Sequence, residues 1–248
     1  MLTRILGACL VAGVLSGLAV SGLQQVTTVP LILEAEVYEK AAEKAAAPEH
    51  SSLTDTNDAK LILVHGDMAA EPGHAEAWEP EDGLQRTAFT TVATVGTSVG
   101  FALMLLAAML ASGVEIAPKT AAVWGLAAFV STGLAPGLGL APELPGSAAA
   151  ELLSRQIWWV STAAMTAAGI WLLFRSPGAS RLVAGLALIA MPHVFGAPDT
   201  HTFTSTAPAE LAGHFASASL ALHAVLWIAV GASVGYFWQR FNHSEALA

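Results

Sequence analysis

Six stretches of this chain are long and apolar enough to cross a lipid bilayer, and no other feature restricts the fold as strongly. The hydrocarbon core of a bilayer requires about 20 apolar residues in helical form. The six stretches span residues 5–23, 87–112, 120–140, 153–174, 182–197 and 215–238. The fifth is the weakest prediction because it is short and contains Pro192. None alternates with a period of two, so we expect an all-α, polytopic helical membrane protein with about six transmembrane helices and no barrel strands.

Charge is concentrated in one part of the chain. Only 12% of the residues are charged, about half the fraction of a soluble domain. Residues 24–86 hold thirteen acids and four bases, a net charge of −9, whereas the other six acids and six bases cancel. We therefore predict four parts, namely a first transmembrane helix (1–24), a long acidic periplasmic loop (25–86), a five-helix membrane bundle (87–240) and a cytoplasmic tail (241–248). This acidity argues against nucleic acid as a partner, so membrane lipid is the expected partner.

Two local patterns refine this plan. The stretch that begins at Pro30 is rich in helix-forming residues, so we expect a short helix lying over the outer face of the membrane. Basic residues near the ends of the apolar stretches set the orientation, because Lys and Arg in short loops favour the cytoplasm. If Arg4 is cytoplasmic, Arg155 is the only base after the acidic loop that falls on the opposite side. The later bases that share the side of Arg4 are Lys119, Arg175, Arg181 and Arg240. Both termini are thus expected in the cytoplasm, with the first helix uncleaved.

Small and hydroxyl side chains recur at helical spacing in the apolar stretches. We expect glycine pairs to allow close helix contacts, and they are Gly13/Gly17, Gly96/Gly100 and Gly231/Gly235. Hydroxyls line one face of the second stretch, at Thr87, Thr90, Thr91, Thr94, Thr97 and Ser98. These hydroxyls could form hydrogen bonds between helices or line a hydrated path, and we favour the hydrogen bonds. In the third stretch Pro136 and Gly137 break the helix near its outer end, and Glu143, which follows the break, is either a loop acid or a functional group.

The chemically most informative segment lies in and beside the last two apolar stretches. It carries imidazoles and carboxylates at His193, Asp199, His201, Glu210, His214 and His223. These groups are good ligands for borderline divalent metals, and ionisable residues in a span are functional candidates. Glu210 and His214 lie four residues apart on one helix face, whereas His223 lies about nine residues deeper on another face. We predict a metal site at the outer mouth, with His223 as a second station or a structural residue.

The same residues limit the choice of function. The chain has a single cysteine, Cys9, which excludes a cysteine-based zinc site. Imidazole and carboxylate ligands suit Co²⁺, Ni²⁺ or Zn²⁺ as the transported ion. No permanently bound cofactor is expected. No phosphate-binding loop and no catalytic motif occurs in the sequence, so an enzyme is not expected. Two alternatives remain open: a haem-binding electron carrier with His193 and His223 as axial ligands, or a scaffold subunit that does not transport.

Several motifs occur together in a fixed order, and they are EAWEPEDGLQRTAFT, GLGLAPELPG, RQIWW, MPHVFGAP and PAELAGHFASASL. In this order the chain resembles the CbtA family of predicted cobalt transporters. The resemblance implies a bacterial inner-membrane protein of cobalt uptake, linked to cobalamin supply and often beside a small one-span subunit of the CbtB type. The polar candidate residues that these motifs include are Glu143, Arg155, His193, Glu210 and His214. Glu143 and Arg155 therefore join the candidate metal-site residues as a second tier.

Overall fold

The computed structural model describes residues 1–46, 80–175, 178–200 and 204–243, and within these ranges the chain is helical and forms no strand. The elements are α1 (Leu2–Val26), α2 (Thr28–Ala46), α3 (Leu84–Ser112), α4 (Pro118–Phe129), the π-helical segment η1 (Val130–Leu134), α5 (Ala135–Gly137), α6 (Leu152–Arg175), α7 (Ala179–Phe195) and α8 (Ala209–His243). An isolated bridge between Ser147 and Ser205 joins two loops. The predicted all-α class is confirmed.

Five helical stretches are long and apolar enough to span a bilayer. They are α1, α3, the continuous run Pro118–Gly137, α6 and α8. Helix α7 is apolar but has only 17 residues, which gives a length of about 26 Å at 1.5 Å per residue. Pro192 lies inside its last turn. The polytopic helical membrane protein predicted from the sequence is therefore confirmed, and the weakest of the six expected spans is also the shortest of the six helical stretches that correspond to them.

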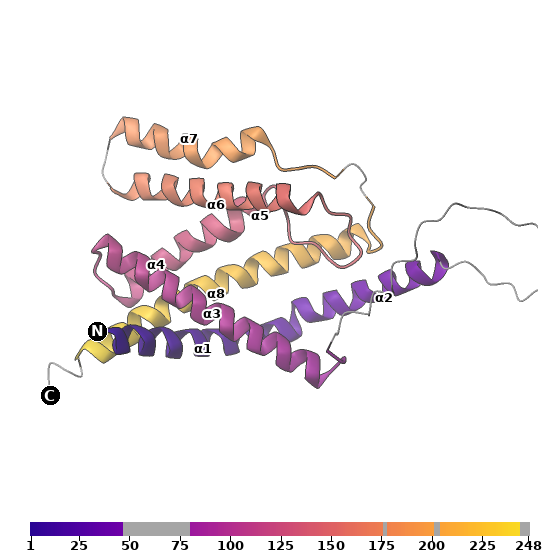
Figure 1. The fold of residues 1–248 in the computed structure, drawn as a ribbon, viewed down its shortest axis with the longest axis horizontal. Helices are drawn as coiled ribbons and strands as arrows, with labels where there is room; N and C mark the ends of the chain where they lie inside the picture. The colour runs from indigo at the N-terminus through magenta and orange to yellow at the C-terminus, as the bar shows by residue number, and fades with distance from the viewer. Residues whose placement is uncertain (47–79, 176–177, 201–203, 244–248) are drawn as a thin grey trace, which may run out of the picture.

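The two ends of the described chain lie on the same side of the bundle (Figure 1). There the Arg4 guanidinium donates a hydrogen bond of 2.9 Å from Nη1 to Asn242 Oδ1. We call this the termini side, and the opposite end, with residues 138–151, 196–200 and 204–208, the loop side. Helix α8 packs against α1 and α4, α1 packs against α3, and α6 and α7 form an antiparallel hairpin. The hairpin contacts the remaining helices mainly through η1 and α5, near the loop side.

Glycine allows backbone-level contact between the main helix pairs. A Cβ atom at Gly13 would lie 2.5 Å from Val99 Cα on α3, and one at Gly231 would lie 2.3 Å from Ala121 O on α4. Gly17 and Gly235 make similar approaches, so the predicted contacts at Gly13/Gly17 and Gly231/Gly235 are confirmed. Such contacts matter in lipid, because van der Waals packing replaces the hydrophobic effect as the force between helices.

The predicted contact at Gly96/Gly100 is wrong. A Cβ atom at either residue would meet nothing within 4 Å. Helix α3 instead meets α1 through Val95 and Val99, so the two glycines point away from α1.

The hydroxyls of α3 form the expected helix-to-helix hydrogen bonds at two positions. Ser21 and Thr91 are hydrogen bonded at 2.7 Å, and Thr94 donates to Gln24 at 3.1 Å.

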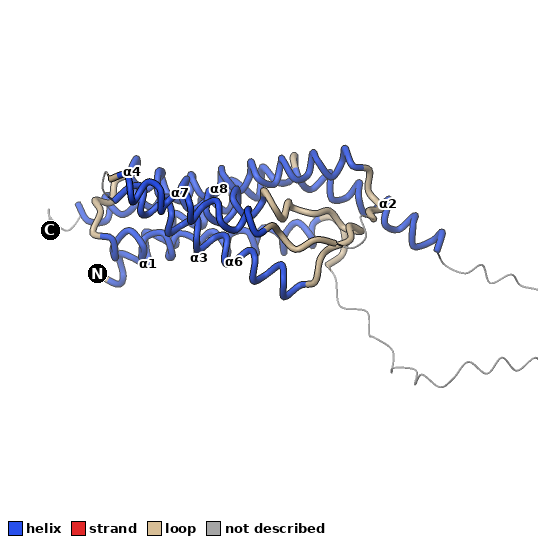
Figure 2. The backbone as a smooth tube through the Cα atoms, turned by 90° about the horizontal axis from the view of Figure 1, so that it is seen from above, coloured by secondary structure: helices blue, strands red, loops and turns tan. Residues whose placement is uncertain are grey.

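Helix α2 confirms the helix expected in the acidic loop, but its expected placement across the membrane face is wrong. Figures 1 and 2 show α2 running along the bundle axis and projecting beyond the start of α8. Only Thr27 separates α2 from α1, which accounts for the shared direction. At its base, α2 contributes Ala35 to a small core on the loop side with Leu144, Ala207 and Leu211.

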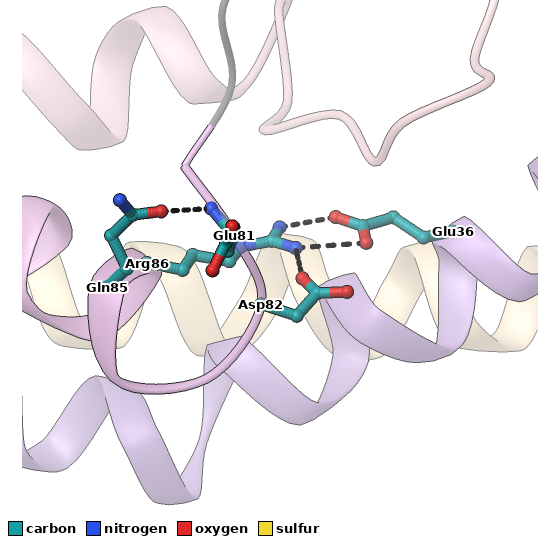
Figure 3. Close-up of polar contacts among 5 residues, drawn as sticks. All are labelled: Glu36, Glu81, Asp82, Gln85 and Arg86. Carbon is teal, nitrogen blue, oxygen red and sulfur yellow. Dashed lines mark hydrogen bonds and ion pairs between the residues drawn. The ribbon is translucent and has the colours of Figure 1, made fainter.

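An ion-pair cluster ties α2 to the start of α3 (Figure 3). The Arg86 guanidinium donates to both carboxylate oxygens of Glu36 and, at 3.1 Å, to Asp82. These hydrogen bonds from Arg86 hold the pKa of Glu36 below its ordinary value. A bidentate Arg–carboxylate pair is directional as well as strong, so it fixes where α2 leaves the bundle.

Substituting Gly13 with leucine should destabilise the bundle by about 1–3 kcal/mol, because the new side chain would overlap the α3 backbone. Gly96→Leu is the matched control, since it adds the same side chain to open space. The free energy of unfolding of both variants can be measured in mixed micelles. Equal losses for the two variants would contradict the assigned α1–α3 contact.

Candidate functional site

A cavity of about 780 Å³ opens on the loop side and extends into the middle of the bundle. Helices α1, α2, α3, α6 and α8, together with η1 and the loop after it, contribute to its wall. The polar residues of the wall are Gln24, Thr28, Thr97, Thr132, Glu143, Arg155, Gln156, Ser219 and His223. A cavity with this many polar groups inside a membrane bundle can hold water or a hydrated ion.

A second cavity of about 1,040 Å³ lies on the termini side and is mostly apolar. It extends between α3, α4 and α6 to Ser112 and Arg175. Four residues line both cavities, and they are Phe101, Thr132, Trp159 and His223. These four residues, which we call the shared layer, therefore lie between the loop-side cavity, whose largely apolar wall carries those polar residues, and the more apolar cavity that reaches the termini side.

The π-helical segment η1 brings the third span to the shared layer. The Ala135 amide bonds to the carbonyl of Val130, five residues back, which is the wider π-helical pattern. Pro136 explains the irregularity, because proline has no N–H to offer the Thr132 carbonyl four residues earlier. The sequence predicted a break near Pro136, and the structure keeps Pro136 helical and moves the irregularity to 130–134. Such segments often occur at functional sites, and this one carries Thr132 and Gly133 to the cavity.

His223 has a specific environment in the shared layer. The Trp227 indole N–H donates to His223 Nε2 at 2.9 Å and lies 3.1 Å from Thr132 Oγ1, so one donor faces two acceptors. The imidazole stacks near Phe101 and meets Phe129 edge-on, with ring centroids 6.2 and 5.9 Å apart. Because Nε2 accepts a hydrogen bond, a neutral imidazole here carries its proton on Nδ1. The nitrogen that could bind a metal is thus covered by the indole.

Nδ1 of His223 lies against the π-helical segment. A Cβ atom at Gly133 would be 2.7 Å from Nδ1, closer than side-chain carbons approach a nitrogen. Glycine at position 133 is therefore what allows the His223 ring to lie flat against η1. This residue was not among those singled out from the sequence, because its importance depends on a contact between helices far apart in the chain.

Glu143 and Arg155 form an ion pair in the wall of the loop-side cavity. Arg155 Nη2 donates to Glu143 Oε2 at 2.9 Å. The other acid close to Arg155 in sequence, Glu151, is hydrogen bonded to Ser154 and to the Leu153 amide at the start of α6, which holds the pKa of Glu151 below its ordinary value. The second-tier residues of the sequence analysis thus lie in the same cavity as His223.

The residues predicted for the outer mouth are spread over the loop side. His193 meets Trp158 edge-on near the end of α7, with ring centroids 5.9 Å apart. Asp199 is exposed in the following loop, and Glu210 and His214 are exposed in the first turns of α8. His201 lies outside the described residues. Within the described part of the chain, no three His, Cys, Asp or Glu side chains form a group that could hold a metal ion.

The two cavities bear on the haem alternative, and they also contain residues that the sequence did not single out. His193 lines neither of the two cavities described above, and His193 and His223 contact different aromatic residues, so neither of these cavities places them together as axial ligands. The cavity residues missed from the sequence include Gln24 and Gln156. Both lie near the ends of apolar stretches, where a polar residue is ordinarily interfacial, so only the tertiary contact singles them out.

Comparison with known proteins gives one match. A family model described as "Probable cobalt transporter subunit (CbtA)" matches residues 2–239, which is nearly the whole chain. Searches of curated proteins and of solved structures found no match.

Gly133→Ala should displace the His223 ring, because the added methyl group would collide with Nδ1. The hydrogen bond from Trp227 to Nε2 should then be lost. The measurement is the ring ¹⁵N NMR spectrum of histidine-labelled protein in nanodiscs, where Nε2 should move toward the position of a nitrogen without a hydrogen bond. Gly100→Ala is the control and should leave the spectrum unchanged, whereas an unchanged spectrum for Gly133→Ala would contradict the geometry.

Proposed function

The chain belongs to the CbtA family of probable cobalt transporter subunits, and on that basis we propose that it takes up Co²⁺ across the bacterial inner membrane. Both termini would lie in the cytoplasm, so the loop side would face the periplasm. The distribution of bases supports this orientation. Lys119, Arg175, Arg181 and Arg240 lie at helix ends on the same side as Arg4, which is the pattern expected of cytoplasmic loops.

The observation that carries this proposal is the cavity that leads from the loop side to His223 and has polar residues in its wall. A dissolved cation can enter only where polar groups replace part of its water, and this cavity offers hydroxyl, amide, carboxylate and imidazole groups to mid-bundle. Beyond the shared layer the apolar cavity continues to the termini side. A small displacement of the shared layer would connect the two cavities, which is the arrangement that a transporter requires.

The outer mouth would collect the cation through His193, Asp199, His201, Glu210 and His214. Their imidazole and carboxylate groups suit a borderline divalent ion. The exposed positions of Asp199, Glu210 and His214 on the loop side support this role, since a cation would meet them first. The described members of this set form no closed group of ligands, which is consistent with weak, transient binding of a cargo ion.

His223 would be the second station. Its Nε2 atom becomes available if the Trp227 indole bonds to Thr132 alone, because the same N–H already lies 3.1 Å from the Thr132 hydroxyl. The metal would then replace the indole at Nε2 while Nδ1 keeps its proton. Thr132 would in this way allow His223 to bind a cation without leaving the buried indole N–H unsatisfied.

The energy source and the partner also belong to the proposal. The sequence contains no phosphate-binding loop, so uptake would be driven by an ion gradient or by another subunit. The word subunit in the family description supports a complex, and a small one-span protein of the CbtB type would be the partner. Transport by this chain, not catalysis, accounts for the cavities.

The proposal can be tested by uptake of radioactive Co²⁺ into proteoliposomes, with Ni²⁺ and Zn²⁺ compared. His223→Ala should reduce the maximal rate about tenfold or more, since mutation of even an outer-shell partner of a metal ligand costs roughly 10- to 100-fold in affinity or activity. His214→Ala, at the mouth, should raise KM severalfold with a smaller effect on the maximal rate. Uptake should also fall at acidic pH, because protonated imidazole cannot bind a metal.

His243→Ala, at the opposite end of α8, is the matched histidine control and should transport at the wild-type rate. Wild-type rates for both His214→Ala and His223→Ala, with the variants inserted correctly, would show that the assigned residues do not bind the ion. If this chain transports no Co²⁺ either alone or with its partner subunit, the proposed function is wrong.

A further inference from the structure

The loop-side cavity contains one carboxylate, and that carboxylate is already paired with a cation from the same protein. Arg155 Nη2 and Glu143 Oε2 are 2.9 Å apart, and both residues line the cavity. Among the lining residues these two carry the only full charges, so the pair makes the cavity wall neutral. A neutral wall would not attract a permeating cation until the pair opens.

The two partners are held differently. Glu143 precedes Leu144, whose side chain is only 3% exposed in the small core with Ala35, Ala207 and Leu211. That buried neighbour anchors the backbone at Glu143, whose own side chain is 34% exposed. Arg155 reaches the carboxylate from α6 through a long side chain with several rotatable bonds, and its side chain is 30% exposed. Both side chains of the pair are partly exposed, and such ion pairs contribute little to stability, so this pair can open at low cost.

Electrostatics then distinguishes between cations. At equal distance and dielectric constant, a divalent ion attracts a carboxylate twice as strongly as a guanidinium or a monovalent ion does. A divalent cation can therefore displace Arg155 from Glu143, whereas K⁺ or Na⁺ gains nothing over the resident guanidinium. Gln156 and Thr28 line the same cavity and offer neutral oxygens near the path.

We propose that Glu143 is a cation-binding carboxylate of the loop-side cavity and that Arg155 is its tethered counter-ion, which divalent cations displace and monovalent cations do not. The pair is thus a selectivity filter for charge. This inference rests on the proposed uptake of Co²⁺, and it adds a step between the outer mouth and His223.

A purely structural pair would behave differently. If the pair only fastened the loop 138–151 to α6, removing either partner would weaken the fold and cation binding in the same direction. A tethered counter-ion predicts opposite effects on affinity, because loss of Glu143 removes the ligand, whereas loss of Arg155 removes its competitor. The sign of the change therefore separates the two roles.

The experiment is equilibrium binding of Co²⁺ to the full chain in nanodiscs, with and without excess K⁺. Arg155→Gln should bind Co²⁺ about fivefold more tightly and should become sensitive to K⁺, whereas Glu143→Gln should bind about tenfold more weakly. The double variant should resemble Glu143→Gln, because a competitor has no effect once the ligand is gone. Arg155→Lys should restore the insensitivity to K⁺.

Glu115→Gln, an exposed acid on the termini side, is the control and should bind as the wild type does. Thermal unfolding of every variant checks that the fold is retained. Weaker or unchanged Co²⁺ binding by folded Arg155→Gln would overturn this inference and leave the proposed function standing. Failure of the wild-type chain to bind Co²⁺ at all would overturn both.

Discussion

The backbone contact between α4 and α8 is the interaction on which the rest of the candidate site depends. Gly125 lies against the Trp227 carbonyl, and Gly231 and Gly235 lie against α4, so the two helices approach to a distance that any side chain would prevent. In lipid this close packing replaces the hydrophobic effect as the source of helix association. It also fixes the register between the helices, and that register brings Thr132 and Gly133 of η1 to His223.

From this register the chemistry of the shared layer follows. The widened backbone of η1 compensates for the missing amide of Pro136 and places a hydroxyl beside the Trp227 indole. One indole N–H then has two acceptors, Thr132 and His223, and the imidazole can release it without a buried donor being left unpaired. The two cavities meet at these residues. The proposed binding of a cation at His223 therefore needs only a change of partner within a hydrogen-bonded group.

The sequence predicted those features that depend on local composition. Apolar length predicted five helical stretches that can span a bilayer and also the apolar helix α7, which is shorter than these five. Helix-forming residues predicted α2. The contact at Gly13/Gly17 was predicted correctly and the one at Gly96/Gly100 wrongly. Residue spacing shows that a helix face carries small side chains, but it does not show which helix that face contacts. The same limit applies to the site. His223, Glu143 and Arg155 were each singled out by type or motif, but the cavity that they share depends on tertiary packing, as do the roles of Gln24 and Gly133.

The central claim is that Co²⁺ reaches His223 through the loop-side cavity. Because Co²⁺ is paramagnetic, it should strongly shift or broaden the ring ¹⁵N signals of any histidine that it binds. The measurement is a Co²⁺ titration of histidine-labelled protein in nanodiscs, with the His223 signal identified by its loss in His223→Ala. We expect the Nε2 signal of His223 to shift or disappear at saturating Co²⁺ and the Nδ1 proton to remain. A His223 signal that stays unchanged while Co²⁺ saturates the protein would contradict the account.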